Sequence, residues 1–120
     1  MSGNPWPTEI RLSKDRRALR VRFDDGVDHS LPAEYLRVLS PSAEVQGHNP
    51  EQRVTVPGKR NVAITAVDPV GNYAVRLTFD DGHNTGLFSW SYLRTLGDEQ
   101  ERRWQAYLSE LAAKGLSRDG

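Results

Sequence analysis

Apolar and polar residues alternate in two similar stretches of the chain, "ALRVRFDDG" from Ala18 and "YAVRLTFDDG" from Tyr73. Such alternation is typical of a strand with one buried face. The Asp-Asp-Gly that ends each stretch favours a tight turn, because glycine readily takes the positive φ that the turn needs. The apolar positions are Leu19, Val21 and Phe23 in the first stretch and Val75, Leu77 and Phe79 in the second. The chain therefore contains two related units.

Each unit is predicted to contain a hairpin, the Asp-Asp-Gly turn, a return strand and a short helix. In the first unit we expect strands at 9–13, 18–23 and 27–31 and a helix at 32–39, with Pro32 in its first turn. In the second unit we expect strands at 62–67, 73–79 and 83–88 and a helix at 89–96, with Ser89 as its N-cap. The predicted fold is α+β: a compact, strand-rich single domain built from two similar hairpin–strand–short-helix units, plus a C-terminal helix.

The remaining segments set the predicted boundaries. Residues 1–8 form a flexible lead-in, 9–97 the domain, 98–114 the C-terminal helix and 115–120 a frayed tail. The helix is expected to start with Asp98 and Glu101 as a capping pair, to end at Gly115, and to bury a stripe made of Trp104, Leu108 and Leu111. A long polar connection, 40–61, joins the two units, and loops of this length are often functional.

Composition narrows the class of protein. Sixteen basic residues balance sixteen acidic ones, so there is no bulk attraction to nucleic acid or to an anionic membrane. The absence of Cys excludes disulfides, Cys-ligated zinc and Cys-ligated iron–sulfur clusters. No apolar run is long enough to span a bilayer, and we expect no signal peptide because the first ten residues contain no apolar segment. We therefore expect a cytoplasmic protein that binds neither nucleic acid nor membrane.

Few residues suggest a reaction. "GKR" at 58–60 lacks the flanking residues of a phosphate-binding loop, and the adjacent acids at 24–25 and 80–81 are typical of turns. None of His29, His48 and His83 is followed two residues later by Asp, as the iron site of a non-haem oxygenase would require. No nucleophile–base–acid set stands out. The chain is therefore predicted not to be an enzyme, with enzymatic activity as the third alternative behind the two functions given below.

Two further groups of side chains leave alternatives open. A basic cluster fits a solvated sheet face, and also a docking surface for an acidic partner or RNA; its members are Arg11, Lys14, Arg16, Arg17, Arg20 and Arg22. The aromatic residues Phe88, Trp90 and Tyr92 fit the core, whereas an exposed Trp90 would indicate a docking patch.

Three segments carry a family resemblance: "LPAEYLRVLSPSAEVQGH", "VPGKRNVAI" and "GNYAVRLTFDDGHNTGLFSWSYLRTL". They resemble a bacterial domain family of formerly unknown function that is similar to the N-terminal domain of gamma-butyrobetaine hydroxylase and trimethyllysine hydroxylase. The resemblance covers about residues 8–97 and is most specific from Gly71 to Leu96. It implies a stand-alone member of the family with a compact α+β fold. Related domains are attached to P-loop scaffold ATPases that carry iron–sulfur clusters.

In the hydroxylases this domain is not the catalytic one, and the resemblance implies a structural zinc held by three Cys and one His. The three Cys positions correspond to Ser40, Ser42 and Val45, and the His position corresponds to His83. Because hydroxyl and isopropyl groups cannot replace thiolates, we expect this zinc site to be lost and no cofactor to be bound. The corner formed by the loop and His83 is expected to persist through hydrogen bonds from His83 to a loop carbonyl or hydroxyl.

Two functions from different classes follow. The first is a non-catalytic binding or adaptor module, an accessory to iron–sulfur cluster maturation or to an oxygenase assembly, whose partner is another protein such as an iron–sulfur scaffold ATPase. Its predicted surface combines the 40–60 loop with His83, Trp90, Lys59 and Arg60. The alternative is an iron- or zinc-binding protein in which His83 is joined by His48, Glu44 or Asp81 as ligands.

Overall fold

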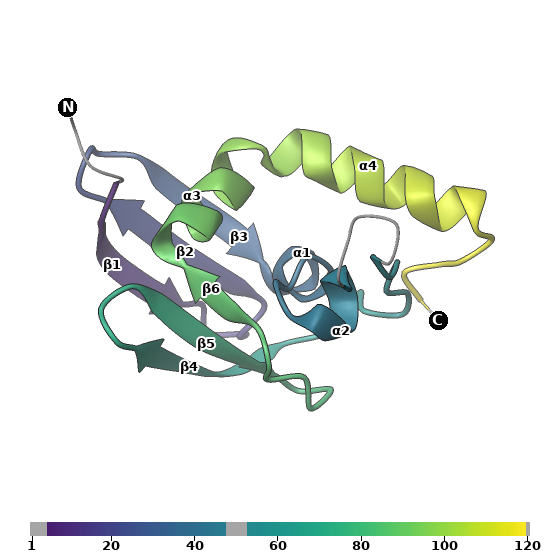
Figure 1. The fold of residues 1–120 in the computed structure, drawn as a ribbon, viewed down its shortest axis with the longest axis horizontal. Helices are drawn as coiled ribbons and strands as arrows, with labels where there is room; N and C mark the ends of the chain where they lie inside the picture. The colour runs from purple at the N-terminus through teal and green to yellow at the C-terminus, as the bar shows by residue number, and fades with distance from the viewer. Residues whose placement is uncertain (1–4, 48–52, 120) are drawn as a thin grey trace.

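The computed structural model describes residues 5–47 and 53–119 and shows an α+β fold with two three-stranded antiparallel sheets (Figure 1). The first sheet, ordered β1-β2-β3, consists of β1 (Pro7–Leu12), β2 (Ala18–Phe23) and β3 (Asp28–Pro32). The second, ordered β4-β5-β6, consists of β4 (Ile64–Val70), β5 (Ala74–Phe79) and β6 (Leu87–Ser89). The helices are α1 (Ala33–Val38), α2 (Ala43–Gln46), α3 (Trp90–Asp98) and α4 (Gln100–Ala113). The predicted fold class is confirmed.

The Asp-Asp-Gly turn has the same geometry in both units. The Phe23 amide donates to the Val27 carbonyl at 2.8 Å, and the Phe79 amide donates to the His83 carbonyl at 2.9 Å. Gly26 and Gly82 take φ values of 88° and 90°, a left-handed conformation that strains any residue with a Cβ atom. Glycine at the third loop position therefore sets the register of both hairpins.

The two units share one hydrophobic core. The apolar faces of β2 and β5 are fully buried together with residues of β3, β6, α1, α3 and α4, and the largest of these side chains are Phe23, Phe79, Phe88, Tyr35 and Tyr107. Arg20 and Arg22 lie on the opposite face of β2, where they pair with Asp28. The alternation in the sequence thus corresponds to one interior built by both units.

Several strand bounds differ from those predicted. β1 starts inside the predicted lead-in, because the Asp24 amide donates to the Trp6 carbonyl at 2.8 Å and holds this segment against the first turn. β4 runs to Val70, so its turn centres on Gly71. β6 is shorter than predicted, because residues 83–86 leave the ladder and contact the loop after α1 instead. Pro32 ends β3 and is the N-cap of α1 rather than part of its first turn.

The predicted start of the C-terminal helix is wrong. α3 continues to Asp98, and Glu99 separates it from α4 with the non-helical angles φ −109° and ψ 18°. Asp98 cannot cap α4, because its carboxylate accepts hydrogen bonds from Arg94 and pairs with His29. Ser89 is confirmed as the N-cap of α3, since its hydroxyl accepts from the Tyr92 amide at 3.1 Å.

The tail after α4 makes specific contacts where the sequence predicts fraying. Gly115 ends the helix at φ 66°, as predicted. The amides of Gly58 and Arg60 then donate to the carbonyls of Ser117 and Arg118 at 2.9 and 3.1 Å. The tail therefore lies along the end of the long connection. No helix within residues 5–47 and 53–119 combines the length and apolar character needed to cross a bilayer.

Candidate functional site

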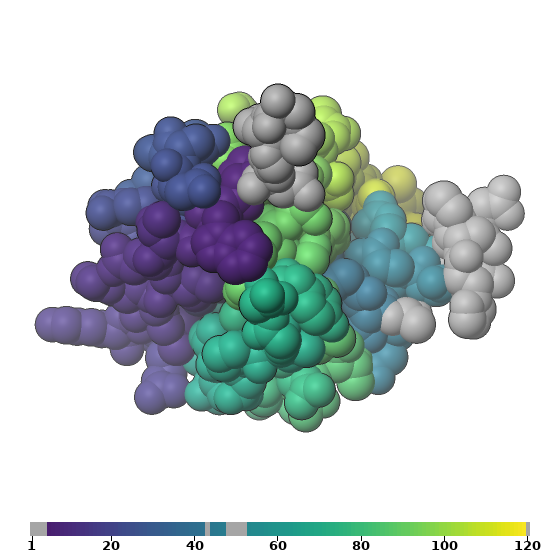
Figure 2. All heavy atoms as spheres, turned by 60° about the vertical axis from the view of Figure 1, so that its left-hand side comes forward, coloured from purple at the N-terminus to yellow at the C-terminus, as the bar shows by residue number. Residues whose placement is uncertain are grey.

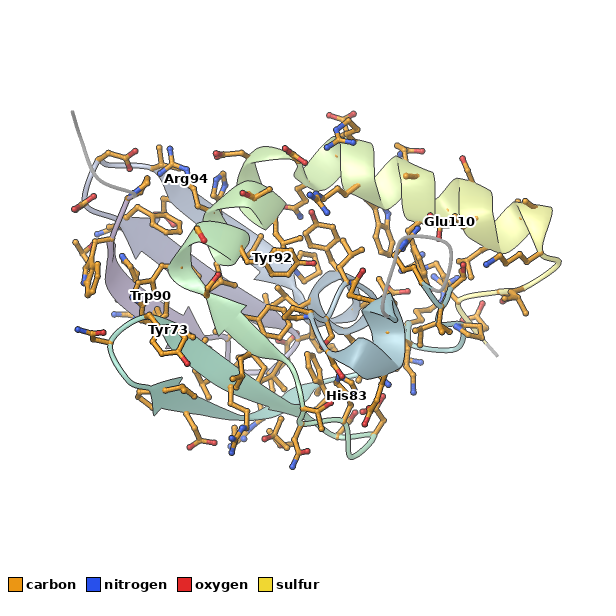
Figure 3. The ribbon with its side chains drawn as sticks, in the orientation of Figure 1. Tyr73, His83, Trp90, Tyr92, Arg94 and Glu110 are labelled. Atoms are coloured by element: carbon orange, nitrogen blue, oxygen red, sulfur yellow. The ribbon has the colours of Figure 1, made fainter. Side chains whose placement is uncertain are left out.

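His83 lies in a polar corner between the second Asp-Asp-Gly turn and the connection from α1 to α2 (Figure 3). Its Nε2 is 2.9 Å from the Ser40 hydroxyl and its Nδ1 is 3.1 Å from a Glu44 carboxylate oxygen. The His83 side chain is only 3% exposed. The corner predicted from the sequence is thus present and is closed by a hydrogen bond to a loop hydroxyl.

The contacts of His83 define its protonation state. A carboxylate can only accept, so Nδ1 carries the proton that points to Glu44, and a neutral ring then accepts from the Ser40 hydroxyl at Nε2. Burial lowers the pKa of His83, and the nearby Arg37 lowers this pKa further. The charges of Glu44 and Asp81 act in the opposite direction without reversing the result. His83 is therefore a neutral, hydrogen-bonded structural residue at pH 7.

Asp81 is engaged by three donors. Lys59 Nζ and Arg37 Nε each lie 2.7 Å from its Oδ2, and the His83 amide donates to its Oδ1 at 3.0 Å. Burial by itself raises the pKa of Asp81, but the hydrogen bonds from Lys59, the His83 amide and Arg37 together lower this pKa to about 2. Both oxygens are used inside the protein, so Asp81 is poorly placed to ligate a metal.

The positions that correspond to the zinc ligands of the hydroxylases are also closed. The Ser42 hydroxyl is 2.7 Å from the Thr85 hydroxyl, and Val45 packs in the interior. The described part of the chain contains no group of three His, Cys, Asp or Glu residues arranged to hold a metal ion. His48 lies outside the described residues. Iron or zinc binding through His83 and Glu44 stays a prediction.

We expect Asp81→Asn to lower stability in a pH-dependent manner. A carboxyl whose pKa falls from 3.8 to about 2 on folding stabilises the protein above pH 4, and this contribution is lost as the pH falls through 2. The shift corresponds to about 2 kcal/mol, and solvent screening of the partly exposed turn reduces it to about 1 kcal/mol. Urea unfolding at pH 7 and at pH 2.5 measures the difference from the wild type.

Asp68→Asn is the matched control for this experiment. It removes the same charge from an exposed side chain of β4 that forms no ion pair among the described residues. A deficit of Asp81→Asn that is equally large at both pH values would contradict the assigned role of Asp81.

The structure places Lys59 of the predicted partner surface beside the His83 corner, through Asp81, but separates Trp90 from it. Trp90 and His83 are at opposite ends of the β5–β6 hairpin (Figure 3). The five steps of β5 between these ends correspond to about 17 Å at 3.3 Å per residue. Lys59 is held by Asp81, and Arg60 by Asp119 of the tail. Trp90 therefore belongs to a surface of its own.

Trp90 is half-buried against the core and forms an aromatic cluster with Trp6 and with Tyr73, whose carbonyl accepts from the Trp90 amide at 3.0 Å. Its ring meets that of Trp6 edge-on at 6.2 Å between centroids, and its Nε1 donates to the Asn72 carbonyl at 2.8 Å. Trp6 and Tyr73 are 48% and 54% exposed. Figure 2 shows this side of the molecule, where the start of β1 (purple) lies beside the β4–β5 hairpin (teal).

The aromatic cluster flanks an apolar cleft of about 600 Å³ between the two sheets. The cleft is lined by Ile10, Leu12, Thr65, Ala66, Val67, Pro69, Val75 and Trp90. β1 and β4 form its walls, and each of them is the edge strand of its sheet. Arg16 closes one end, because its carbonyl accepts from the Ile64 amide and its guanidinium donates to the Thr65 carbonyl. We call this cleft and the cluster of Trp6, Tyr73 and Trp90 the β1–β4 surface.

The fold and the closed corner together define a small α+β domain of two related three-stranded units. The model of the family "Gamma-butyrobetaine hydroxylase-like, N-terminal" matches residues 10–94. The chain belongs to this family. The matched residues start within β1, end within α3 and include the His83 corner, whereas α4 and the tail lie beyond them.

Solved structures agree with this assignment. Two proteins with solution NMR structures share 49% and 47% identity with the chain, each over 98% of it and over 92% and 90% of their own lengths, with TM-scores of 0.83 and 0.82. A crystal structure of a protein of unknown function from Acidithiobacillus ferrooxidans, a member of the DUF971 family, shares 44% identity over 76% of this chain and 91% of its own, with a TM-score of 0.63. A comparison with curated proteins finds no match.

Sequence reasoning missed two members of the β1–β4 surface, Trp6 and Tyr73. Trp6 lies in a Pro-rich segment that resembles a disordered lead-in, and Tyr73 begins a predicted strand. The sequence did contain one indication that these residues are exposed: each is a large aromatic side chain directly beside a turn or a terminus, where burial is difficult. Their proximity to Trp90 depends on tertiary structure, because the three residues come from three separate segments.

Proposed function

We propose that the protein is a non-catalytic adaptor that binds another protein through the β1–β4 surface. The observation that carries this proposal is the apolar cleft between two edge strands, flanked by three aromatic rings of which two are about half exposed. Aromatic side chains are enriched at protein interfaces, where they contribute large contact areas. The polar corner, by contrast, uses its side chains internally.

The shape of the cleft favours an extended segment as the occupant. β1 and β4 each pair on one side only, so both present backbone groups to which a further strand can add. The backbone of β4 is already engaged at Ile64 and Thr65 by Arg16, which leaves β1 as the better edge for pairing. Apolar side chains on alternate positions of the added strand would fill the cleft.

Charge at the closed end of the cleft specifies the partner further. Lys14 and Arg17 are exposed in the turn that follows β1, and neither forms an ion pair within the described residues. An acidic residue at one end of the bound segment would complement them. The proposed partner is thus a protein with an extended apolar segment that ends in acidic residues. The family resemblance suggests an iron–sulfur scaffold ATPase as the first protein to test.

The double variant Trp6→Ala/Tyr73→Ala is expected to weaken binding to that ATPase at least tenfold in isothermal titration calorimetry. Truncation of interface aromatics commonly costs more than 1 kcal/mol each, and tenfold corresponds to 1.4 kcal/mol. The affinity of the wild type for the ATPase is expected to fall as the salt concentration increases, because salt screens the attraction of Lys14 and Arg17 to acidic residues of the partner.

Leu87→Ala is the matched control. Leu87 is 39% exposed on β6, on the face of the second sheet opposite the cleft, so its truncation removes exposed apolar area elsewhere. Equal affinities of the double variant, the control and the wild type would overturn the β1–β4 surface. Absence of any binding to the wild type would overturn the ATPase as the partner.

A further inference from the structure

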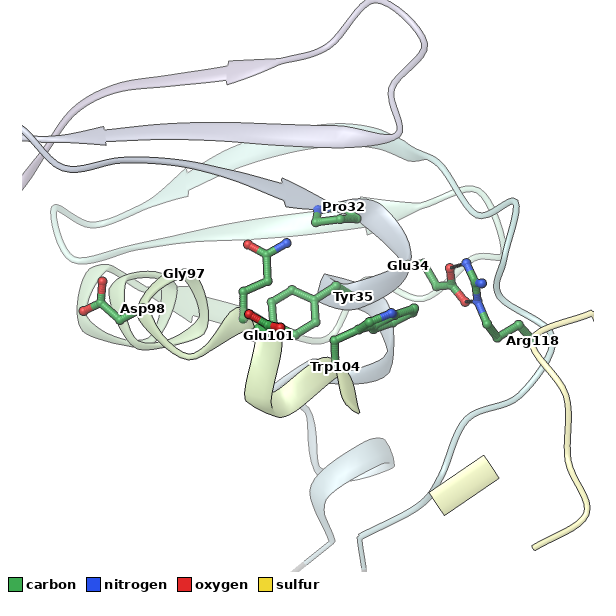
Figure 4. A pocket seen from close by; sticks show the side chains of 9 residues that line it. Pro32, Glu34, Tyr35, Gly97, Asp98, Glu101, Trp104 and Arg118 are labelled. Carbon is green, nitrogen blue, oxygen red and sulfur yellow. Dashed lines mark hydrogen bonds and ion pairs between the residues drawn. The ribbon is translucent and has the colours of Figure 1, made fainter. Parts of the chain in front are cut away.

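A second pocket lies between the family-matched domain and α4, away from both the β1–β4 surface and the His83 corner. Its volume is about 670 Å³, and it is lined by Pro32, Glu34, Tyr35, Gly97, Asp98, Gln100, Glu101, Trp104 and Arg118 (Figure 4). The two aromatic rings of the pocket, Tyr35 and Trp104, meet edge-on at 6.3 Å between centroids. The proposed adaptor function uses none of these residues.

One end of the pocket contains an ion pair between the Glu34 carboxylate and the guanidinium of Arg118. Glu34 is 7% exposed, and both of its oxygens accept from Arg118, Oε2 from Nε at 2.8 Å and Oε1 from Nη2 at 2.6 Å. The Arg118 guanidinium carbon also lies 5.1 Å from the centre of the Trp104 ring. A two-pronged carboxylate contact combined with an aromatic face is selective for guanidinium over a simple ammonium group.

The guanidinium is supplied by the last residues of the chain. Arg118 lies in the tail that follows α4, beyond the residues that the family model matches. The tail is held by the backbone contacts at Gly58 and Arg60 and by the pair of Arg60 with Asp119. A short segment attached in this way can separate from the domain at a much lower free energy than the core elements.

The volume of the pocket is free space beside the guanidinium of Arg118, which is part of the pocket wall. From the Glu34–Arg118 pair it extends past Trp104 and Tyr35 toward Glu101 in the first turn of α4 (Figure 4). Glu101 forms no ion pair among the residues that the structure describes, so it can receive a second positive charge. The space and the charge therefore fit a basic polypeptide segment.

We propose that this pocket is a binding site for an arginine side chain of another polypeptide, and that Arg118 occupies it when that polypeptide is absent. The incoming arginine replaces the guanidinium of Arg118 on Glu34 and Trp104, and the tail leaves the pocket. Glu34 keeps a cationic partner in both states, which a buried carboxylate requires. The tail is therefore in the pocket when the partner is absent and outside the pocket when the partner is bound.

N-acetyl-arginine amide is the probe, and N-acetyl-citrulline amide, which has nearly the same shape without the charge, is its control. Arg118→Ala vacates the pocket, so we expect it to bind the arginine probe at least tenfold more tightly than the wild type in calorimetric titration. Binding is expected to shift the Trp104 indole signal in NMR spectra. The double variant Glu34→Gln/Arg118→Ala is expected to lose this binding.

Two further measurements keep the test decisive. Arg118→Gln still donates a hydrogen bond to Glu34 and replaces Arg118→Ala if that variant does not fold. In the wild type, high concentrations of the arginine probe are expected to move the Ser117 and Asp119 amide signals toward their positions in the Arg118 variant. Equal binding of the arginine and citrulline probes, or no binding to either folded variant, overturns the proposal. Trp6→Ala/Tyr73→Ala should leave arginine binding unchanged, which separates this site from the adaptor surface.

Discussion

Phe79→Ala is expected to lower the free energy of unfolding by about 3–5 kcal/mol, the range measured for truncation of a buried Phe in other proteins. Phe79 is 1% exposed at the end of β5, and its side chain packs in the core shared by both units. Phe23 holds the same position in the first unit, so Phe23→Ala is expected to have a similar effect. Urea unfolding followed by circular dichroism measures both losses.

The form of the transition matters as much as its midpoint. If the two units share one interior, each variant should still unfold in a single transition, because neither unit retains a core of its own. The exposed Leu87→Ala serves as the control and is expected to change stability by less than 1 kcal/mol. Two separate transitions, with only one of them shifted by each Phe variant, would contradict the shared core.

Gly97→Ala is expected to destabilise the protein by about 2 kcal/mol although it lies in a helix. A Cβ atom at Gly97 would lie 2.1 Å from Cδ2 of His29, far inside van der Waals contact. Overpacking of this kind costs about 1–3 kcal/mol or more, and the better helix propensity of Ala returns at most about 1 kcal/mol. Thermal and urea unfolding of the single variant measure the net effect.

In the His29→Ala background, the effect of Gly97→Ala on stability is expected to have the opposite sign. With the imidazole removed, the added methyl group has room, so Gly97→Ala in the His29→Ala background is expected to stabilise by up to about 1 kcal/mol through helix propensity alone. His29→Ala by itself is expected to cost about 1 kcal/mol through the lost contact with Asp98. A double-mutant cycle with no coupling would show that α3 and β3 are not packed as closely as the structure indicates.

Much of the fold followed from local patterns in the sequence. The alternation in β2 and β5, the Asp-Asp-Gly turns and the Ser89 cap are each determined by neighbouring residues, and each was confirmed. The predictions failed where a side chain that should form a local hydrogen bond is bound by another residue instead. Asp98 has the sequence features of an N-cap, but His29 and Arg94 occupy its carboxylate, and Asp98 is the last residue of α3 instead.

The site shows the same division. A hydrogen bond between His83 and a loop hydroxyl was predicted from the family resemblance and is found at Ser40. The sequence placed His83 and Trp90 on one predicted surface, because they are only seven residues apart. Their separation along the chain does not show that they lie at opposite ends of the β5–β6 hairpin. Trp6, Tyr73 and the Arg118 pocket were missed, since their members are brought together only by packing.

The sequence alone determined the two related units, each with one apolar strand face, because period-two alternation and left-handed turn residues act through near neighbours. Tertiary structure decided where the edge strands β1 and β4 leave a cleft, that Trp6 and Tyr73 join Trp90, and that Arg118 reaches Glu34 across 84 positions of the chain. These contacts depend on how the sheets and α4 pack against each other, and that packing is a sum of many weak long-range contacts which no local pattern encodes.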